Sequence, residues 1–303
     1  MGRMTTVSVV IPCFRDSETL ASALDSVRAQ THKALEVIVV NDCSPETARI
    51  ESVLAGYPEV KYFRNPKNLG LAATRNAGAQ LATSDVLTFL DADDELHPQK
   101  IEFQLSVFEP ALAVSCNVKR FSTSEEFSRV ENFHAPCPWR CVNNSRAIVW
   151  RNSLTGASIM ISRGKFLSIG GYDTSLRSCE DFDLWLRLLD AGTPVSDILW
   201  PLYLYRRNPQ GLSRNAPNIS YWEYAVINKY FARAKVSGVA PVSEGLTRIW
   251  WLTKHFRRSA IAGNRALFEA TVSNMDTLHR WPVLRLCLVP LAWLVAVRLL
   301  LSR

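Results

Sequence analysis

Short apolar segments that end abruptly in polar residues limit what this chain can fold into. Val7–Ile11, Val37–Val40 and Val86–Leu90 are rich in β-branched residues and almost continuously apolar. Such runs are typical of strands that are covered on both faces, as in a parallel sheet. Segments with helical periodicity, such as Leu71–Leu81, separate them. The alternation predicts an α/β fold with a mostly parallel central sheet, flanking helices and right-handed crossovers.

The pattern continues, less regularly, to about residue 205. Asp16 is expected to cap the first helix, and Ser122–Arg151 is expected to be a long irregular segment of the kind that is more often functional than passive. We expect further strands and helices near Val60–Phe63, Pro98–Phe108, Leu112–Lys119, Ala157–Ile161, Asp181–Leu189 and Asp197–Tyr205. The 303 residues, 48% of them apolar, are enough to bury a full core.

Charge divides the chain into two regions. From residue 201 onward there are 15 lysines and arginines against 4 acidic residues, whereas residues 1–200 carry 20 against 24. We therefore expect two regions with different roles, a domain over residues 1–215 and a basic helical region over residues 216–303. The seven cysteines are scattered and odd in number, and no secretory signal opens the chain, which predicts reduced thiols in the cytoplasm.

Two Asp-x-Asp pairs compete as a metal site. Asp91 and Asp93 follow the buried strand Val86–Leu90, whose carboxyl end opens onto the ligand side of an α/β sheet. Hard carboxylate ligands suit Mg²⁺ or Mn²⁺, with substrate phosphates completing the shell. The alternative is an acidic turn that caps the helix near Pro98.

Helical geometry argues against the second pair as a chelator. Asp181 and Asp183 are two residues apart on a predicted helix, so their side chains point in different directions. Asp183 is expected to form a solvated salt bridge with Arg187, four residues on. Asp181 lies on the first turn of the inward apolar stripe, where a helix cap is as reasonable as a catalytic role.

Two more polar residues fit the same edge of the sheet. Asp42 follows the strand Val37–Val40, so it and Asp91 and Asp93 are expected to line one rim. Arg75 would add a cation for phosphate.

Six stretches in order carry a family resemblance. VVIPCFRD, VIVVNDCSP, NLGLAATRNAG, LTFLDADDELHPQK, GGYD and EDFDLWLRL together resemble the family 2 inverting glycosyltransferases, which have the GT-A fold. The resemblance covers about residues 5–210 and leaves the C-terminal third unexplained.

The resemblance implies roles for individual residues. Asp42 would read the nucleotide base, usually uracil, with the backbone of Ile11 and Pro12 packing nearby, and Arg75 would contact base or phosphate. Asp91 and Asp93 would bind the metal, with Asp93 the direct ligand, and Asp181 would be the general base. Asn41 departs from the family because many relatives have a second acid there, and a Gln-x-x-Arg-Trp element of processive synthases is absent, which favours transfer of a single sugar.

The C-terminal stretch Trp281–Leu301 is apolar but contains Arg285, Pro290 and Arg298. Only twelve uncharged residues lie between the arginines, short of the roughly 20 that a spanning helix needs. We expect an interfacial or re-entrant helix on anionic lipid, supported by Lys254, Arg257 and Arg258 upstream. A core helix or a homo-oligomer interface is the alternative.

The resulting expectation is a metal-dependent enzyme that moves one sugar from a nucleotide-sugar, a UDP-sugar, to a glycan or polyprenyl-linked acceptor in bacterial surface polysaccharide synthesis. It would be peripheral or monotopic at the inner face of the plasma membrane, with no nucleic-acid partner. Transfer to polyprenyl phosphate and a non-catalytic nucleotide- or lipid-binding module remain alternatives. A Rossmann dehydrogenase is disfavoured because no Gly-x-Gly-x-x-Gly follows the first strand.

Overall fold

The structure is a computed structural model that describes residues 5–33, 35–121, 132–207, 216–237 and 243–262. The chain forms two compact units. The first contains residues 1–144 and 153–208, and the second contains residues 145–152 and 209–303.

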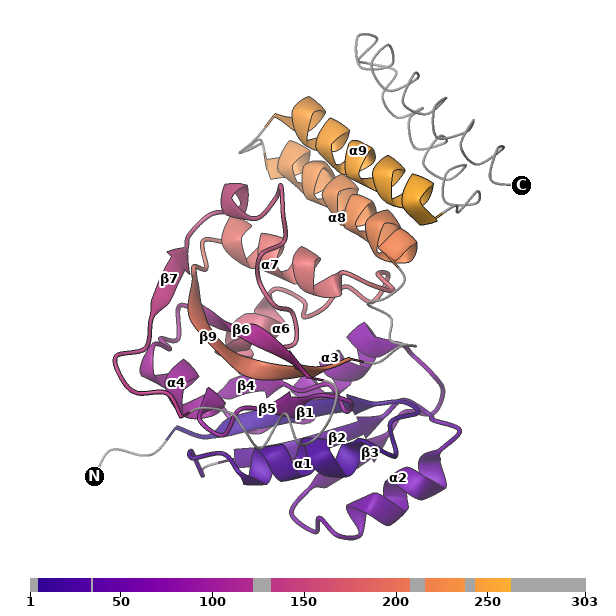
Figure 1. Ribbon diagram of the computed structural model, residues 1–303, viewed down its shortest axis with the longest axis vertical. Helices are drawn as coiled ribbons and strands as arrows, with labels where there is room; N and C mark the ends of the chain where they lie inside the picture. Colours follow the sequence, from indigo (N-terminus) through magenta and orange to yellow (C-terminus); the bar gives the residue numbers. More distant parts are fainter. Residues whose placement is uncertain (1–4, 34, 122–131, 208–215, 238–242, 263–303) are drawn as a thin grey trace. The chain divides into compact units, whose positions relative to one another are not determined.

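In the first unit, strands and helices alternate strictly from β1 to β4, and the order is less regular beyond β4 (Figure 1). The elements are β1 Val7–Cys13, α1 Leu20–Arg28, β2 Leu35–Asn41, α2 Thr47–Leu54, β3 Lys61–Arg64, α3 Leu71–Leu81, β4 Val86–Phe89, β5 Glu95–Leu96, α4 Lys100–Ser106, β6 Ala113–Phe121, β7 Trp139–Val142, β8 Met160–Ser162, α6 Arg163–Ser168, α7 Glu180–Asp190 and β9 Val195–Arg206.

One sheet runs through this unit in the order β3-β2-β1-β4-β8-β6-β9-β5, with β7 paired to β9. The pairs among β3, β2, β1 and β4 are all parallel, which confirms the expected parallel layer. Beyond β4 the sheet is mixed, because β8 is antiparallel to both of its neighbours while β6 and β9 are parallel. The α/β architecture predicted from the sequence is confirmed.

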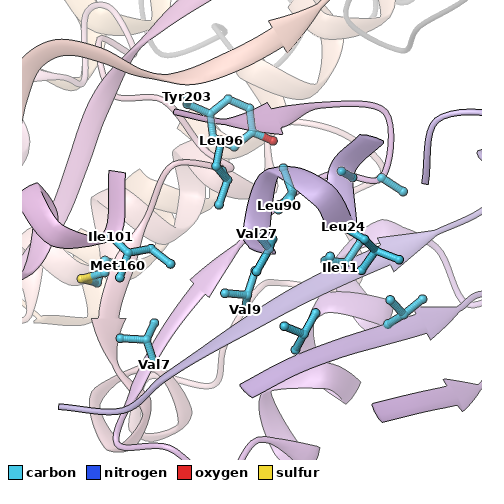
Figure 2. Packing of buried hydrophobic residues seen from close by; sticks show 14 of the residues in the cluster. Val7, Val9, Ile11, Leu24, Val27, Leu90, Leu96, Ile101, Met160 and Tyr203 are labelled. Carbon is cyan, nitrogen blue, oxygen red and sulfur yellow. The ribbon is translucent and has the colours of Figure 1, made fainter. Parts of the chain in front are cut away.

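Alternate residues of β1 pack on opposite faces of the sheet. Val7, Val9 and Ile11 belong to a buried cluster that includes Leu24 and Val27 of α1 (Figure 2). On the other face α3 approaches so closely that a Cβ atom on Gly78 would lie 2.3 Å from Cγ1 of Val10. The two covered faces explain why the strand sequences are continuously apolar.

Two local predictions were wrong. Asp16 does not cap α1: its carboxylate accepts the N–H of Phe14 at 2.9 Å, and the helix begins after Thr19 without a side-chain cap. The stretch Ser122–Arg151 is not wholly irregular, because its described part contains β7 and a 3-10 turn at Ser145–Ala147. Pairing with the distant strand β9, which local sequence does not reveal, makes β7 a strand.

The second unit contains α8 Ala216–Ser237 and α9 Glu244–Ala262, which pack against each other. Glu223 of α8 accepts from Lys254 at 3.0 Å and from Arg258 at 2.9 Å. These two cations, expected at a lipid surface, therefore also link the two helices. Within the residues that the structure describes, no helix is both long and apolar enough to cross a membrane, and Trp281–Leu301 lies outside them.

Lys100 of α4 is fully buried in the first unit. Its Nζ donates to Oγ1 of Thr88 at 2.8 Å and to Oε1 of Gln104 at 2.7 Å, and both acceptors are neutral. Burial lowers the pKa of Lys100 to about 8 because the charged form is poorly solvated.

We predict that this buried amine makes folding stability depend on pH. Between about pH 8 and 10.5 the unfolded chain holds the Lys100 proton more tightly than the folded chain, so stability rises with pH. The difference in unfolding free energy between wild type and Lys100→Met should change by on the order of 2 kcal/mol across this range. Urea titrations at pH 7, 8, 9 and 10 measure it; a constant difference would contradict the assignment.

Candidate functional site

The carboxyl ends of β2, β1 and β4 lie side by side in the sheet and carry polar residues beyond them. The N–H of Asp42 donates to the carbonyl of Cys13 at 2.9 Å, and the N–H of Leu90 donates to the carbonyl of Val10 at 3.0 Å. Asp42 and the Asp91 turn therefore flank the end of β1. Pro12 is buried near this end, where β4 no longer pairs with β1, so its missing N–H costs no ladder bond there.

Asp42 is buried and organises the segment that enters α3. Its Oδ1 accepts from Nδ2 of Asn65 and the N–H of Leu69, and its Oδ2 accepts from the N–H of Gly70, all at 2.8 Å. A carboxylate has about four lone-pair sites, so one acceptor position remains on Oδ2. The expected contact with a nucleotide base would have to use that position.

Asn41 is fully buried and closes the turn after β2. Its Oδ1 accepts the N–H of Ser44 at 2.8 Å, and its Nδ2 donates to Thr47 at 3.0 Å and to Tyr62 at 2.9 Å. An amide supplies both the donor and the acceptor that this turn uses, whereas a carboxylate could only accept.

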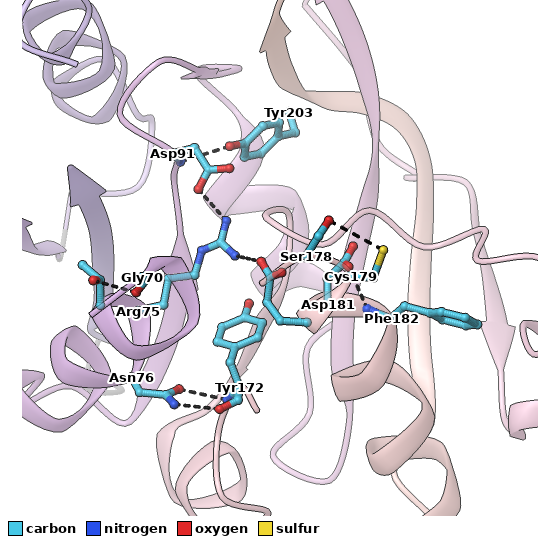
Figure 3. Close-up of polar contacts among 12 residues, drawn as sticks. Gly70, Arg75, Asn76, Asp91, Tyr172, Ser178, Cys179, Asp181, Phe182 and Tyr203 are labelled. Carbon is cyan, nitrogen blue, oxygen red and sulfur yellow. Dashed lines mark hydrogen bonds and ion pairs between the residues drawn. The ribbon is translucent and has the colours of Figure 1, made fainter. Parts of the chain in front are cut away.

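Arg75 of α3 connects the end of β4 to the start of α7 (Figure 3). Its side chain is 3% exposed and donates to Oδ1 of Asp91 at 2.5 Å and to Oε1 of Glu180 at 2.7 Å. Burial alone lowers the pKa of Arg75, but Asp91, Tyr172 and Glu180 outweigh it and hold the pKa above its ordinary value. Arg75 therefore stays charged between two carboxylates.

A second contact fixes α3 against the turn before α7. Asn76 makes two hydrogen bonds of 2.8 Å to the backbone of Tyr172, one through each side-chain atom (Figure 3). The Tyr172 ring is buried and its centroid lies 5.3 Å from the Arg75 guanidinium carbon. A Cβ on Gly171 would come within 2.5 Å of Oδ1 of Asn76, so this turn needs glycine for space as well as for its φ of +64°.

The turn that carries Asp91 and Asp93 is fixed by the last residues of β9. The hydroxyl of Tyr203 accepts the N–H of Asp91 at 3.1 Å, and the N–H of Arg206 donates to Oδ1 of Asp94 at 2.7 Å. The Arg206 side chain donates to the carbonyl of Asp93 at 2.9 Å and to Glu95 at 2.6 Å. The expected alternative role in capping α4 is not seen, since that helix has no side-chain cap in the described chain.

Carboxylates are crowded around this turn. Burial and the charges of Asp91 and Asp93 raise the pKa of Asp94 to about 9. Burial raises the pKa of Asp16 to about 7, and Asp93, Asp91 and Glu46 contribute in the same direction. Sequence reasoning did not assign Asp16 to the site, because the proximity of Asp16 depends on how the loop after β1 folds back.

Asp181 lies in the first turn of α7 and is partly buried. Its Oδ1 accepts the N–H of Phe182 at 2.8 Å, a first-turn donor of α7, although the residue at the N-cap position is Cys179, whose side chain makes no capping bond. Burial and the charge of Glu180 raise the pKa of Asp181 to about 7, against the opposing effects of the Phe182 N–H and Arg75. A carboxylate with a pKa near neutrality is suited to act as a general base.

Asp183 forms the predicted salt bridge with Arg187 at 2.7 Å, but the prediction that this pair is solvated was wrong. The Asp183 side chain is fully buried, and Arg187 also donates to the carbonyls of Ile169 at 2.8 Å and Gly171 at 2.7 Å. The turn before α7 folds over this face of the helix. Asp183 therefore has a structural role.

Three non-glycine residues with positive φ lie beside this site: Arg15 at 62°, Cys43 at 54° and Cys179 at 59°. They follow β1, follow Asp42 and precede Glu180, respectively. Such backbone is unfavourable for side-chain-bearing residues and tends to collect at functional sites.

Asp91 and Asp93 fit a hard divalent cation. They offer carboxylate oxygens, and their charge already raises the pKa of two neighbouring acids, which a cation would relieve. Among the described residues, no three His, Cys, Asp or Glu side chains are arranged to hold a metal ion by themselves. Mg²⁺ in particular is commonly held by one or two carboxylates together with substrate phosphates.

Comparison with known proteins gives a consistent family assignment. The family model described as glycosyl transferase family 2 matches residues 8–172, more than half of the chain. An uncharacterized glycosyltransferase of Haemophilus influenzae is 35% identical over 187 residues, 60% of this chain and 62% of that protein. Amylovoran biosynthesis glycosyltransferase AmsB of Erwinia amylovora is 36% identical over 106 residues, 34% of this chain and 35% of AmsB. The chain thus matches less than two thirds of these relatives' length.

Solved structures of similar fold include a mannosyltransferase and a protein in complex with a nucleotide-sugar. Mannosyltransferase PcManGT from Pyrobaculum calidifontis, in complex with GDP-Man and Mn²⁺, has a TM-score of 0.60 over 99% of this chain and 88% of its own. S. aureus TarS 1–349 in complex with UDP-GlcNAc also has a TM-score of 0.60, over 87% and 75%. Both are 16% identical to this chain, so the likeness concerns the fold.

The raised pKa of Asp181 predicts that this residue reduces stability at neutral and alkaline pH. The folded chain holds its proton up to about pH 7, whereas the unfolded chain releases it near pH 4, so the charged form above pH 7 is destabilising. We expect Asp181→Asn to raise the unfolding free energy by on the order of 2 kcal/mol at pH 8 and by little at pH 4. Urea denaturation at both pH values measures this difference, and equal effects would contradict the pKa.

Proposed function

The chain belongs to glycosyl transferase family 2, and we propose that it transfers one sugar from a UDP-sugar to a glycan or lipid-linked acceptor with inversion at the anomeric carbon. The observation that carries this proposal is the double contact of Arg75. A single buried guanidinium binds Asp91 and Glu180, and so ties the acidic turn after β4 to the first turn of α7, which carries Asp181.

This linkage supports separate roles for the acidic turn after β4 and for Asp181. The acidic turn would hold the diphosphate of the donor, and Asp181 would serve the acceptor. Residues 91 and 181 come from distant parts of the chain, and a reaction between two substrates needs both groups in fixed positions. Because Arg75 is buried and doubly bonded, it is suited to maintain that spacing and less suited to direct contact with the nucleotide base.

In the proposed step Asp181 accepts the proton of an acceptor hydroxyl. The hydroxyl oxygen forms a bond to the anomeric carbon as the bond from that carbon to the diphosphate oxygen breaks, and the nucleoside diphosphate leaves with the electron pair. Attack from the side opposite the leaving group inverts the configuration. The pKa near 7 leaves a useful fraction of Asp181 ionised at neutral pH while retaining basicity.

We propose that Asp91 and Asp93 hold Mg²⁺ or Mn²⁺, with Asp93 the direct ligand. When bound, such an ion neutralises negative charge that develops on the leaving diphosphate. The Asp91 carboxylate also accepts a hydrogen bond from Arg75, and this bond limits how freely the carboxylate can turn toward a cation. The Mn²⁺ bound by PcManGT supports a divalent ion in this fold.

For the nucleotide we propose uracil, read by the remaining acceptor position of Asp42 beside the Pro12 backbone. The uracil N3–H is a donor, which matches that position. TarS in complex with UDP-GlcNAc supports this choice. PcManGT in complex with GDP-Man makes guanine the alternative nucleobase.

The proposed acceptor belongs to bacterial surface polysaccharide synthesis, a choice supported by the similarity to the amylovoran glycosyltransferase. We further propose that residues 1–215 form the catalytic domain and that residues 216–303 attach it to the inner face of the plasma membrane. The basic charge of that region and the apolar stretch Trp281–Leu301 support attachment to anionic lipid.

Asp181→Asn should lose turnover and keep donor binding. Purified protein with Mn²⁺ or Mg²⁺, lipid extract and a panel of UDP-, GDP- and dTDP-sugars provides the assay. Loss of a general base is expected to lower kcat by about 10² to 10⁴. Asp190→Asn, at the exposed end of the same helix, is the matched control and should retain activity.

The same assay has two contrary outcomes. Loss of donor binding together with turnover in Asp181→Asn would refute its assignment as the base. No turnover of any donor by the wild-type protein would favour a nucleotide- or lipid-binding module.

Deletion of residues 281–303 should release the protein from anionic vesicles because it removes the mainly apolar stretch Trp281–Leu301 together with Arg285, Arg298 and Arg303. Sedimentation with phosphatidylglycerol vesicles at low and high salt measures binding. Unchanged sedimentation of the truncated protein would contradict the anchor.

A further inference from the structure

Gly156 lies directly against Asp181. A Cβ atom at Gly156 would lie 2.3 Å from Oδ2, 2.4 Å from Cβ and 2.6 Å from Cγ of Asp181. Rotation about the Cβ–Cγ bond moves only the carboxylate oxygens and leaves Cβ and Cγ in place, so this rotation alone cannot make room. The space that the Asp181 carboxylate takes is therefore available only because residue 156 has no side chain.

Glycine is not needed at this position for its backbone conformation. Gly70, Gly170 and Gly192 have φ of +86°, +83° and +72° with open space around them, whereas Gly156 is outside the left-handed region. An alanine at residue 156 would therefore not pay the cost of a left-handed backbone. The requirement at residue 156 is steric and comes from Asp181.

The segment around Gly156 is held by several buried hydrogen bonds. Ser158 is fully buried; its Oγ donates to the carbonyl of Thr155 at 2.9 Å and accepts the N–H of Cys116 at 3.1 Å. Nε2 of Gln104 donates to the Ser158 carbonyl at 2.7 Å. The backbone on both sides of Gly156 is thus fixed from β6 and α4.

Lys100 completes this support. It donates to Gln104 and to Thr88, and Thr88 in turn donates to the carbonyl of Ile159 at 2.8 Å. Two consecutive carbonyls, of Ser158 and Ile159, are therefore held by side chains that share one buried ammonium. A buried polar network of this kind, when its members are satisfied, rigidifies its surroundings.

We propose that Gly156 is a positioning residue for Asp181: the fixed segment Thr155–Ile159 forms a wall against which the carboxylate is seated. The segment lies against Oδ2 while the Phe182 N–H holds Oδ1, so the wall and this hydrogen bond together set the orientation of the side chain. The inference deepens the proposed function, because it assumes that Asp181 is the base.

The position of the carboxylate also sets its pKa. Glu180 on the same helix, Arg75 of α3 and Tyr172 of the preceding turn are the charged or titratable groups that act on Asp181. A carboxylate displaced by an added methyl group changes its distance from all three and its exposure to water. Gly156→Ala should therefore change the protonation behaviour of Asp181 as well as its placement.

The first test compares Gly156→Ala with Gly164→Ala in the sugar-transfer assay. At Gly164 the nearest atom to an added Cβ is Oγ of Ser162 at 3.8 Å, so this control adds the same methyl group where there is room. We expect kcat of Gly156→Ala to fall by about 100-fold, the size typical of a small misplacement, with KM for the donor unchanged. Unchanged kcat in folded Gly156→Ala would overturn the inference.

The second test does not depend on activity. The difference in stability between the wild-type protein and Asp181→Asn, followed across pH, reports the folded-state pKa of Asp181. In the Gly156→Ala background the midpoint of that difference should move away from about 7. If the midpoint of this pH dependence is the same in both backgrounds, the inference is overturned. If the midpoint moves but Asp181→Asn retains full turnover, Gly156 does position the Asp181 carboxylate and Asp181 is not the general base.

A third test remains informative even if Gly156→Ala folds too poorly for the activity assay. Gly156→Ala should lower Tm much less in an Asp181→Gly background, because the atoms that collide with the new methyl group are gone. Equal losses of Tm in both backgrounds would overturn the proposed contact.

Discussion

The geometry of the candidate site depends on the ion pairs that Arg75 makes on both sides. The guanidinium is buried, and it bonds Asp91 after β4 and Glu180 at the start of α7, which are 89 positions apart in the sequence. Removing one partner of a buried ion pair leaves an uncompensated charge, which is far more costly than the net value of the pair. Helix α3, which places Arg75, is itself positioned by Gly78 against β1 and by Asn76 against the Tyr172 backbone.

Contacts from strand β9 help to fix the conformation of the acidic turn, Asp91–Asp94. Tyr203 and Arg206 of β9 bind the backbone at Asp91 and Asp93 and the side chain of Asp94. Burial, together with the charges of neighbouring carboxylates, raises the pKa values of Asp94 and Asp16, whereas the hydrogen bonds from Arg206 and Tyr203 oppose that rise at Asp94. Such an arrangement is poor for stability in isolation and suited to binding a cation with a diphosphate.

Asp181 shows the same conflict between stability and chemistry. Its burial and its neighbour Glu180 raise its pKa to about 7, which weakens folding above that pH and gives the residue the basicity that proton transfer needs. The wall formed by Thr155–Ile159 extends the site into the core, since the polar network beneath it ends at Lys100. The buried amine and the proposed base are thus parts of one connected structure.

The sequence by itself determined the α/β layer and the positions of Asp42, Asp91 and Asp181 at the ends of elements, because strand and helix periodicities are local properties of the chain. It also placed Asp181 and Asp183 on different sides of α7. It did not determine that Asp183 is buried or that β7 is a strand, since the covering turn and the pairing strand β9 lie elsewhere along the chain, and it did not determine that the Asp16 carboxylate binds the Phe14 N–H and leaves α1 uncapped. Only the tertiary structure decided that Arg75 lies between two carboxylates and that Gly156 faces Asp181, because contacts between distant segments leave no periodic signal in the sequence.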